Sequence, residues 1–120
     1  MSRTQQIEYK GKNIFCIDFS NVAKASEIKE IIHESVQYIR SQPAESVLTL
    51  TNVTGMSFSN EIKELFNDFI KGDKPYIKAS AVYGLNGLQI IFSSLLRITD
   101  RSIKNFTGEQ EAKDWLISLV

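Results

Sequence analysis

The sequence predicts an α/β fold: a mixed, mostly parallel sheet of about five strands with an N-terminal antiparallel hairpin and four helices. Two observations lead to it. Runs rich in β-branched and apolar residues alternate with segments whose apolar residues recur every three or four positions. The connections are short, and such alternation is typical of parallel strands joined by right-handed crossovers. With 120 residues and no internal repeat or linker, we expect a single domain over residues 1–120.

The hairpin is expected at the start of the chain. Residues 5–12 and 13–20 form two short runs, and Gly11 lies in the KGKN stretch between them, where a tight turn favours positive φ. The second run, NIFCIDFS, leaves few polar positions, which is typical of a strand covered by other elements. Cys16 is therefore expected to be a small core residue.

The rest of the chain alternates between helical and extended patterns. Helices are expected at 26–43, 59–72, 88–99 and 107–120, and strands at 46–53, 76–84 and 102–106. Pro43 and Gly72 are expected to end the first two helices. Thr107 followed by Gln110 has the spacing of a capping box for the last helix. The buried stripe of that helix is expected to contain Ala112, Trp115, Leu116 and Leu119.

Composition narrows the location and the partners. Fourteen basic residues balance fourteen acidic ones, so no net field draws the chain to nucleic acid, which is not expected as a partner. No apolar stretch approaches the ~20 residues of a membrane-spanning helix, and the first residues lack the apolar core of a signal peptide. The single cysteine, Cys16, excludes an internal disulfide and suits a reducing compartment. We therefore expect a cytoplasmic protein with no integral membrane segment.

The turn before the second helix contains the first candidate site. In NVTGMSFSNEIKELF, Ser57 and Ser59 lie between an apolar run and a helical pattern. Ser59 immediately precedes NEIKEL, so its hydroxyl is placed to cap the helix, and its loss would cost about 0.5–2 kcal/mol. A phosphate on Ser59 would also be stabilised, because a helix N-terminus is an anion site. Cap and modification site are both open interpretations of Ser59.

The stretches LTLTNVTGMSFSNEI and IKNFTGEQEAKDWL, together with the order of the elements, resemble the STAS family of bacterial anti-sigma-factor antagonists. More narrowly, they are similar to the SpoIIAA-like branch, which shares features with the lipid-binding Sec14/CRAL-TRIO lobe. The resemblance implies the STAS fold, a protein partner, and control by phosphorylation of the second serine of the turn. Ser59 matches that serine, whereas Ser57 and Asn60 replace the family's aspartate and glycine. Ser57, Ser59 and Asn60 are therefore the candidate phosphorylation or partner-binding turn.

A second candidate is a glycine-containing loop. Gly84, Asn86 and Gly87 follow an expected strand and precede an expected helix. Open α/β sheets bind ligands at the carboxyl ends of their strands, so this candidate ligand loop is expected to share one sheet edge with the serine turn. Glycines at such places also serve simply to permit a sharp turn.

The helix expected at 88–99 is the most apolar of the four. Ile90 lies near the side opposite its apolar stripe and Ile98 lies on the flank of that stripe. A mostly buried helix is one interpretation. The other is an apolar interface that includes Ile90 and Ile98 and contacts a partner subunit or a small apolar ligand.

No group of residues predicts an enzyme. His33 is the single histidine and is expected on the exposed side of its helix, so metal and nucleophile schemes lack parts. We expect no catalytic residue, no metal site and no cofactor. The preferred function is a non-enzymatic regulatory or protein-interaction module with a vestigial or modified serine switch, with a homodimer left open. The alternative is a small-molecule or lipid-binding domain of the SpoIIAA-like or Sec14-like type.

Overall fold

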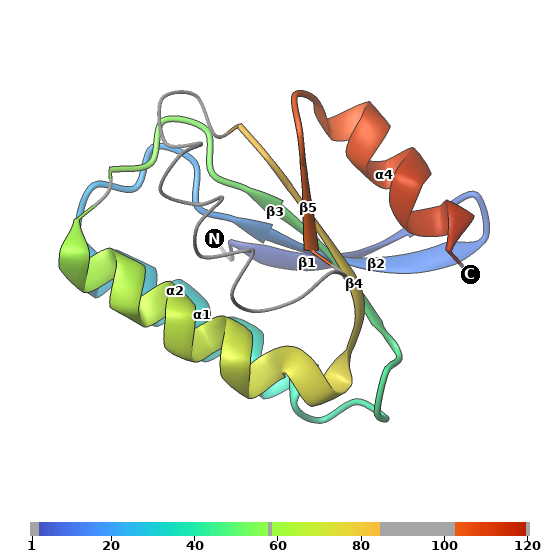
Figure 1. Ribbon diagram of the computed structural model, residues 1–120, viewed down its shortest axis with the longest axis horizontal. Helices are drawn as coiled ribbons and strands as arrows, with labels where there is room; N and C mark the ends of the chain where they lie inside the picture. The colour runs from blue at the N-terminus through green and yellow to red at the C-terminus, as the bar shows by residue number, and fades with distance from the viewer. Residues whose placement is uncertain (1–2, 58, 85–102, 120) are drawn as a thin grey trace.

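The computed structural model of the protein describes residues 3–57, 59–84 and 103–119 (Figure 1). Within these ranges the strands are β1 (Thr4–Tyr9), β2 (Lys12–Asp18), β3 (Val47–Asn52), β4 (Ile77–Tyr83) and β5 (Ile103–Phe106). The helices in the same ranges are α1 (Ala25–Ile39), α2 (Asn60–Asp73), a 3₁₀ turn at Lys74–Tyr76, and α4 (Glu109–Ser118). The third of the four expected helices, at 88–99, lies outside the described residues. None of the described helices is long and apolar enough to cross a membrane.

The strands of the described ranges form one five-stranded sheet, whose spatial order β1-β2-β3-β4-β5 is also the order of the chain. β1 and β2 are antiparallel and are joined by a tight turn at Lys10 and Gly11, both with positive φ. The pairs β2–β3, β3–β4 and β4–β5 are parallel. The prediction of a mixed α/β sheet with an N-terminal hairpin is therefore confirmed.

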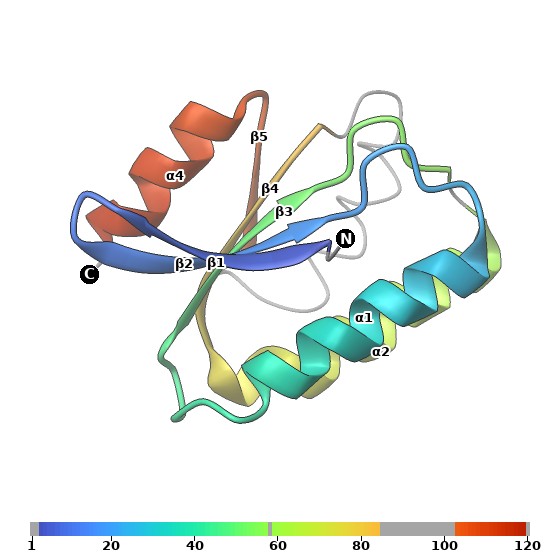
Figure 2. The same ribbon diagram turned by 180° about the vertical axis from the view of Figure 1, so that it is seen from behind.

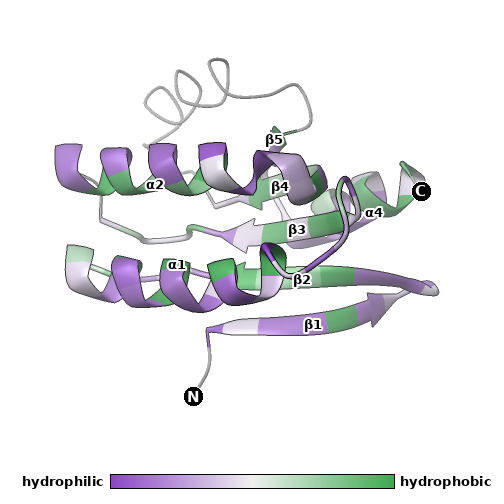
Figure 3. Cartoon of the chain, turned by 90° about the horizontal axis from the view of Figure 1, so that it is seen from below, coloured by the Kyte–Doolittle hydropathy of each residue, from purple (hydrophilic) through white to green (hydrophobic). Residues whose placement is uncertain are grey.

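The direction of the crossovers decides which face each helix covers. α1 joins β2 to β3 and α2 joins β3 to β4, so both crossovers move the same way along the sheet. Right-handed crossovers that move in one direction lie on one face of the sheet. α1 and α2 accordingly lie side by side on one face (Figure 3), and α4 lies on the opposite face (Figures 1 and 2).

An apolar core lies on each side of the sheet. Because alternate residues of a strand face opposite sides, Phe15 and Ile17 of β2 pack in the core under α1 and α2, and Ile14 packs in the core under α4. On the α4 side β4 contributes Ala79 and Ala81, both fully buried. These small side chains let a short helix approach the sheet closely.

α2 continues past Gly72, so the predicted stop at this residue is wrong. The helix includes Asp73, and Lys74 is its C-cap residue. Asp73 lies on the buried side of the helix, is 4% exposed, and accepts a hydrogen bond from Arg40 Nε at 2.9 Å. A β-carbon at Gly72 would lie 2.1 Å from Arg40 Nη2, so the missing side chain leaves room for the guanidinium. The ion pair therefore ties the last turn of α2 to the end of α1.

The start of α4 also differs from the prediction. Gly108 is the N-cap residue and no side chain caps the helix, so the predicted capping box of Thr107 and Gln110 is wrong. The Gln110 amide instead donates a hydrogen bond to the hydroxyl of Tyr9. Gln110 therefore bonds to Tyr9 of the hairpin and not to the backbone at the start of its own helix, as a capping box would require.

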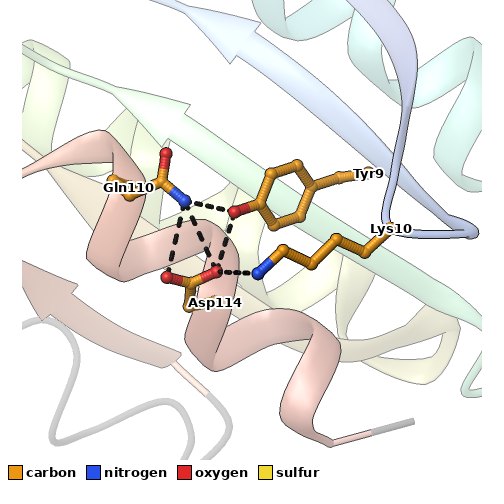
Figure 4. A network of polar contacts seen from close by, with 4 residues as sticks. All are labelled: Tyr9, Lys10, Gln110 and Asp114. Carbon is orange, nitrogen blue, oxygen red and sulfur yellow. Dashed lines mark hydrogen bonds and ion pairs between the residues drawn. The ribbon is translucent and has the colours of Figure 1, made fainter.

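A polar network of Tyr9, Lys10, Gln110 and Asp114 fastens the hairpin to α4 (Figure 4). The Tyr9 hydroxyl donates to Asp114 Oδ1 at 2.8 Å across a sequence separation of 105 residues. Lys10 Nζ lies 3.4 Å from the same oxygen. The hydrogen bond from Tyr9 is the main cause that lowers the pKa of the Asp114 carboxyl. The network aligns α4 over the core that it covers.

Three residues expected in the core are less buried than predicted. Trp115 of α4 is half-buried and packs at the margin of the core under α4. Cys16 is half-buried, because the side of the sheet that it faces is covered in the described chain by the 10-residue helix α4. Leu119 is 43% exposed, because α4 ends at Ser118.

Leu116→Ala tests how strongly α4 is held. Leu116 is fully buried and Leu119 is largely exposed on the same segment, so the two alanine substitutions form a matched pair. Leu116→Ala should lower the free energy of unfolding by about 2–5 kcal/mol, and Leu119→Ala by less than about 1 kcal/mol. Urea unfolding followed by circular dichroism measures both. Equal losses would contradict the packing of α4 on the sheet.

Candidate functional site

The turn that follows β3 is built from short polar contacts above buried apolar anchors. Asn52 Oδ1 accepts hydrogen bonds from the Thr54 backbone N–H at 3.0 Å and from the Thr54 hydroxyl at 2.6 Å. Val53 and Met56 are buried, and the Met56 N–H donates to the Val53 carbonyl at 3.2 Å. The side chain of Asn52 thus folds the turn, and two apolar residues fix it to the core.

Neighbouring loops hold this turn from both sides. On the β2 side, the Asn21 N–H donates to the Thr54 carbonyl at 2.8 Å, and the Ser57 N–H donates to the Val22 carbonyl at 2.9 Å. On the β4 side, a β-carbon at Gly84 would lie 2.1 Å from Thr54 Oγ1 and 2.7 Å from its backbone nitrogen. Gly84, which has a φ of +88°, therefore permits a close approach that another residue would prevent.

The serines stand at the outer side of this anchored turn. Ser57, Ser59 and Asn60 are all exposed. Ser59 has extended φ and ψ and its hydroxyl oxygen accepts a hydrogen bond from the Ile62 N–H at 3.2 Å, so it is the N-cap of α2. Glu61 lies in the first turn, where its carboxylate suits the helix dipole. The cap interpretation of Ser59 is confirmed, and the residue as a whole is exposed.

The other predicted site residues divide into two groups. Gly84 lies beside the serine turn at the carboxyl edge of the sheet, as expected. Asn86 and Gly87 of the candidate ligand loop, and Ile90 and Ile98 of the candidate apolar interface, lie outside the described residues.

Two titratable groups on the α4 side of the sheet, the Tyr83 phenol and the Cys16 thiol, are held in their neutral forms. Burial is the first cause that raises the pKa of Tyr83 to about 12, and Glu109 and Cys16 add to it. Burial also raises the pKa of the Cys16 thiol, against the effect of Lys113. At neutral pH these residues therefore offer a phenol and a thiol as hydrogen-bonding groups.

His33 and the carboxylates do not form a metal centre in the part of the chain that the structure describes. His33 is exposed, as predicted, and its Nε2 lies 3.0 Å from Gln37 Nε2. Within the same ranges no three His, Cys, Asp or Glu side chains lie close enough together to hold a metal ion.

Two hollows on the α1–α2 side of the sheet lie away from the serine turn. A cavity of about 60 Å³ lies between α2 and the sheet and is lined mainly by apolar residues, with Asp73, Thr49 and Ser80 among them. A groove of about 370 Å³ lies between α1 and α2. Phe69 lines both hollows and so separates them.

The ion pair of Arg40 and Asp73 is the feature that our sequence reasoning missed. Burial raises the pKa of the Asp73 carboxyl to about 6, although the hydrogen bond and charge of Arg40 act in the opposite direction. The signal was present, since Asp73 follows Phe66 and Phe69 at the spacing of the apolar stripe. An acidic residue on such a stripe indicates a buried carboxylate with a partner.

The comparisons with known proteins concern the fold. No protein-family model and no curated protein matches the chain. Its structure is similar to the crystal structure of an uncharacterized protein of the DUF3478 family from Shewanella loihica PV-4, described as having a SpoIIAA-like fold. The match covers 94% of this chain and 91% of that one, with 14% sequence identity and a TM-score of 0.67. This chain has a SpoIIAA-like fold. The resemblance seen in the two sequence stretches is therefore confirmed at the level of the fold.

Ser59→Ala and Ser57→Ala test the cap. Only Ser59 accepts a hydrogen bond from the first turn of α2, so its replacement should lower the free energy of unfolding by about 0.5–2 kcal/mol. Ser57→Ala, at an exposed position two residues earlier, should change it by less than about 0.5 kcal/mol. Denaturant titration of both variants is the measurement. A larger loss for Ser57→Ala would show that the cap is misassigned.

Asp73→Asn tests the buried carboxylate. An acid whose pKa rises on folding binds its proton more tightly in the folded state, so the free energy of unfolding falls as the pH rises from about 4 to about 6. The rise from 3.8 to about 6 corresponds to a loss on the order of 3 kcal/mol. We expect the difference between wild type and Asp73→Asn to follow this slope and to be flat above about pH 7. Asp68→Asn, at an exposed position on the same helix, is the control; a flat difference for Asp73→Asn would contradict the assignment.

Proposed function

We propose that the protein is a non-enzymatic regulatory module that binds a protein partner through the turn of Ser57, Ser59 and Asn60, with Ser59 as a phosphorylation switch. The observation that carries the proposal is the exposed residue Ser59 on a turn anchored by the buried residues Val53 and Met56. A modifying enzyme can reach this residue, and a partner meets it in a fixed position. The SpoIIAA-like fold supports the same reading as an analogy of architecture.

A phosphate at Ser59 would change the surface and leave the fold intact. The phosphoryl group carries about −1.5 to −2 charges at neutral pH and would lie at the N-terminus of α2, which favours anions. The Ser59 oxygen already faces the Ile62 N–H, so the modified residue stays at a favourable place. Exposed Glu61 then adds a like charge nearby. A partner that binds the unmodified turn would meet this new negative charge and be released.

The residues that differ from the family pattern change the charge of the serine turn in its unphosphorylated state. With Ser57 in place of an aspartate, the stretch from Met56 to Asn60 has no charged residue before modification. A phosphate on Ser59 would therefore convert a neutral contact surface into a strongly negative one. The proposal includes a cytoplasmic location, which a single half-buried cysteine suits.

The small-molecule or lipid alternative receives less support. A lipid or drug-sized ligand occupies a pocket of about 300 Å³ or more. The cavity that the described residues line between α2 and the sheet measures about 60 Å³. The groove of about 370 Å³ between α1 and α2 is larger, but the charged residues Lys29, Arg40 and Asp68 line it. Gly84 of the candidate ligand loop is itself covered by Thr54. A ligand that co-purifies with the protein in native mass spectrometry would reverse this preference, and the same spectrum reports whether the protein is a homodimer.

Peptide mapping by mass spectrometry of protein isolated from its source cell tests the switch. We expect a phosphate on Ser59 and none on Ser57, because only Ser59 stands at the anion-binding helix start. In a matched kinase assay with cell extract, Ser59→Ala should abolish labelling and Ser57→Ala should preserve it. Absence of phosphate from both serines, in growing and in stressed cells, would contradict the switch.

A pair of variants separates charge from structure. Ser59→Asp and Ser59→Asn both retain a good helix cap and differ by one charge. We expect a partner captured by wild type to bind Ser59→Asn with similar affinity and Ser59→Asp at least about tenfold more weakly. Equal binding of the two variants would show that charge at this position does not control the complex.

A further inference from the structure

The groove between α1 and α2 has two helical walls. Its α1 wall contains Lys29, Ile32, His33, Val36 and Arg40, and its α2 wall contains Leu65, Asp68, Phe69 and Gly72. The residues of each wall recur every three or four positions and so lie along one side of each helix. At 1.5 Å per residue, the α1 wall extends for about 16 Å, or about three helical turns.

The bottom of the groove is apolar, and the Arg40 guanidinium lies at one of its ends. Ile32, Val36 and Leu65 are half-buried in the chain itself, and Phe69 beneath them is 7% exposed. Gly72 presents no side chain at the end of the groove where the Arg40 guanidinium lies. A row of half-exposed aliphatic side chains between two parallel helices is the kind of surface that receives the apolar stripe of a third helix.

The charges on the two walls differ. Lys29 and His33 stand on the α1 wall, and neither Lys29 nor Asp68 has an ion-pair partner among the residues that the structure describes. Arg40, in contrast, is paired with Asp73. Among the described residues, the unpaired positive charge of the α1 wall is therefore that of Lys29, in the first turn of the wall, and the unpaired negative charge of the α2 wall is that of Asp68.

We propose that this groove binds an amphipathic helix of another protein, with carboxylates on the flank that faces Lys29 and His33. The apolar bottom between two parallel helical walls favours a helix as the occupant, and the charge of Lys29 on the α1 wall, unpaired among the described residues, favours carboxylates on the flank that faces it. A second copy of the chain fits less well, because a two-fold contact would set this hollow against itself and repeat the same charges. A membrane fits less well, because the apolar residues lie in a hollow rimmed by both signs of charge.

This inference goes beyond the proposed function, since no groove residue belongs to the turn of Ser57, Ser59 and Asn60. Leu65, the first α2 residue of the groove, lies six positions after Ser59 on the same helix. A partner could thus occupy both surfaces, but each is tested by its own variants.

The test uses two fluorescein-labelled peptides of about 14 residues, long enough to cover the groove as a helix. Both have leucines at positions i, i+3, i+4 and i+7; one has glutamates on one flank, and the other has lysines in their place. Fluorescence anisotropy with the full chain should give a Kd below about 100 µM for the glutamate peptide and at least about tenfold weaker binding of the lysine peptide. Lys29→Glu should reverse this order, and Val36→Asp should abolish binding of both peptides.

Controls keep the result specific. Lys71→Glu makes the same charge change at an exposed α2 position outside the groove and should alter the Kd by less than about twofold. Ser59→Asp should leave the affinity for the peptide unchanged, so failure here and failure of the serine switch are distinguishable. Circular dichroism establishes that Val36→Asp is folded, and Lys29→Glu, at an exposed position, provides the test if it is not.

Four results would overturn the proposal. The first is no binding of either peptide at 1 mM, a concentration that would detect about −4 kcal/mol of affinity. The second is equal binding of both peptides, or an order that Lys29→Glu leaves unchanged. The third is a dimer in sedimentation experiments that Val36→Asp disrupts, because the occupant of the groove is then a second copy of the chain. Binding to anionic phosphatidylserine vesicles that Val36→Asp disrupts would likewise overturn the proposal, because the occupant is then a lipid surface.

Discussion

Right-handed crossovers that move in one direction across the sheet are the constraint on which the rest of this structure depends. Because β2, β3 and β4 are neighbours in chain order, α1 and α2 share one face and run parallel to each other. Their N-terminal ends therefore meet at the carboxyl edge of the sheet, where the Asn21 N–H bonds to the Thr54 carbonyl at 2.8 Å. Their sides form the groove. The serine turn and the groove thus have one topological origin, although they contain different residues.

The same constraint leaves the two faces of the sheet unequal. Among the residues that the structure describes, one face is covered by two helices of 15 and 14 residues and the other by the 10-residue helix α4. Because α4 is short, it is held on the sheet by close packing and by polar contacts with the hairpin. It packs on Ala79 and Ala81, and the hydroxyl of Tyr9 in the hairpin holds Asp114. Cys16, on this less covered face, is consequently half-buried.

How much could be predicted from the sequence depends on whether a feature is local. Periodicity predicted the strands and the stripes of α1 and α2. The position of Ser59 directly before a helical pattern predicted its cap. Each of these features depends on neighbouring residues. The predicted stop at Gly72 and the capping box at Gln110 were wrong for one reason. In each case a residue distant in sequence supplied the deciding partner: Arg40 for the last turn of α2, and Tyr9 for Gln110. A sequence read without contacts cannot rank such partners.

The last turn of α2 contains two adjacent residues, Gly72 and Asp73, that are each unfavourable at their positions. Gly72 weakens a helix by about 1 kcal/mol relative to alanine, and a buried carboxylate such as Asp73 is costly even when it is paired. Sequences tend to retain such inconsistencies at functional positions. Here both residues contact Arg40. Gly72 leaves room for the Arg40 guanidinium, and Asp73 forms an ion pair with it. Because Arg40 is paired, the positive charge on the α1 wall that has no ion-pair partner among the described residues is that of Lys29. The end of the groove nearest the serine turn thus becomes the end that selects an acidic partner.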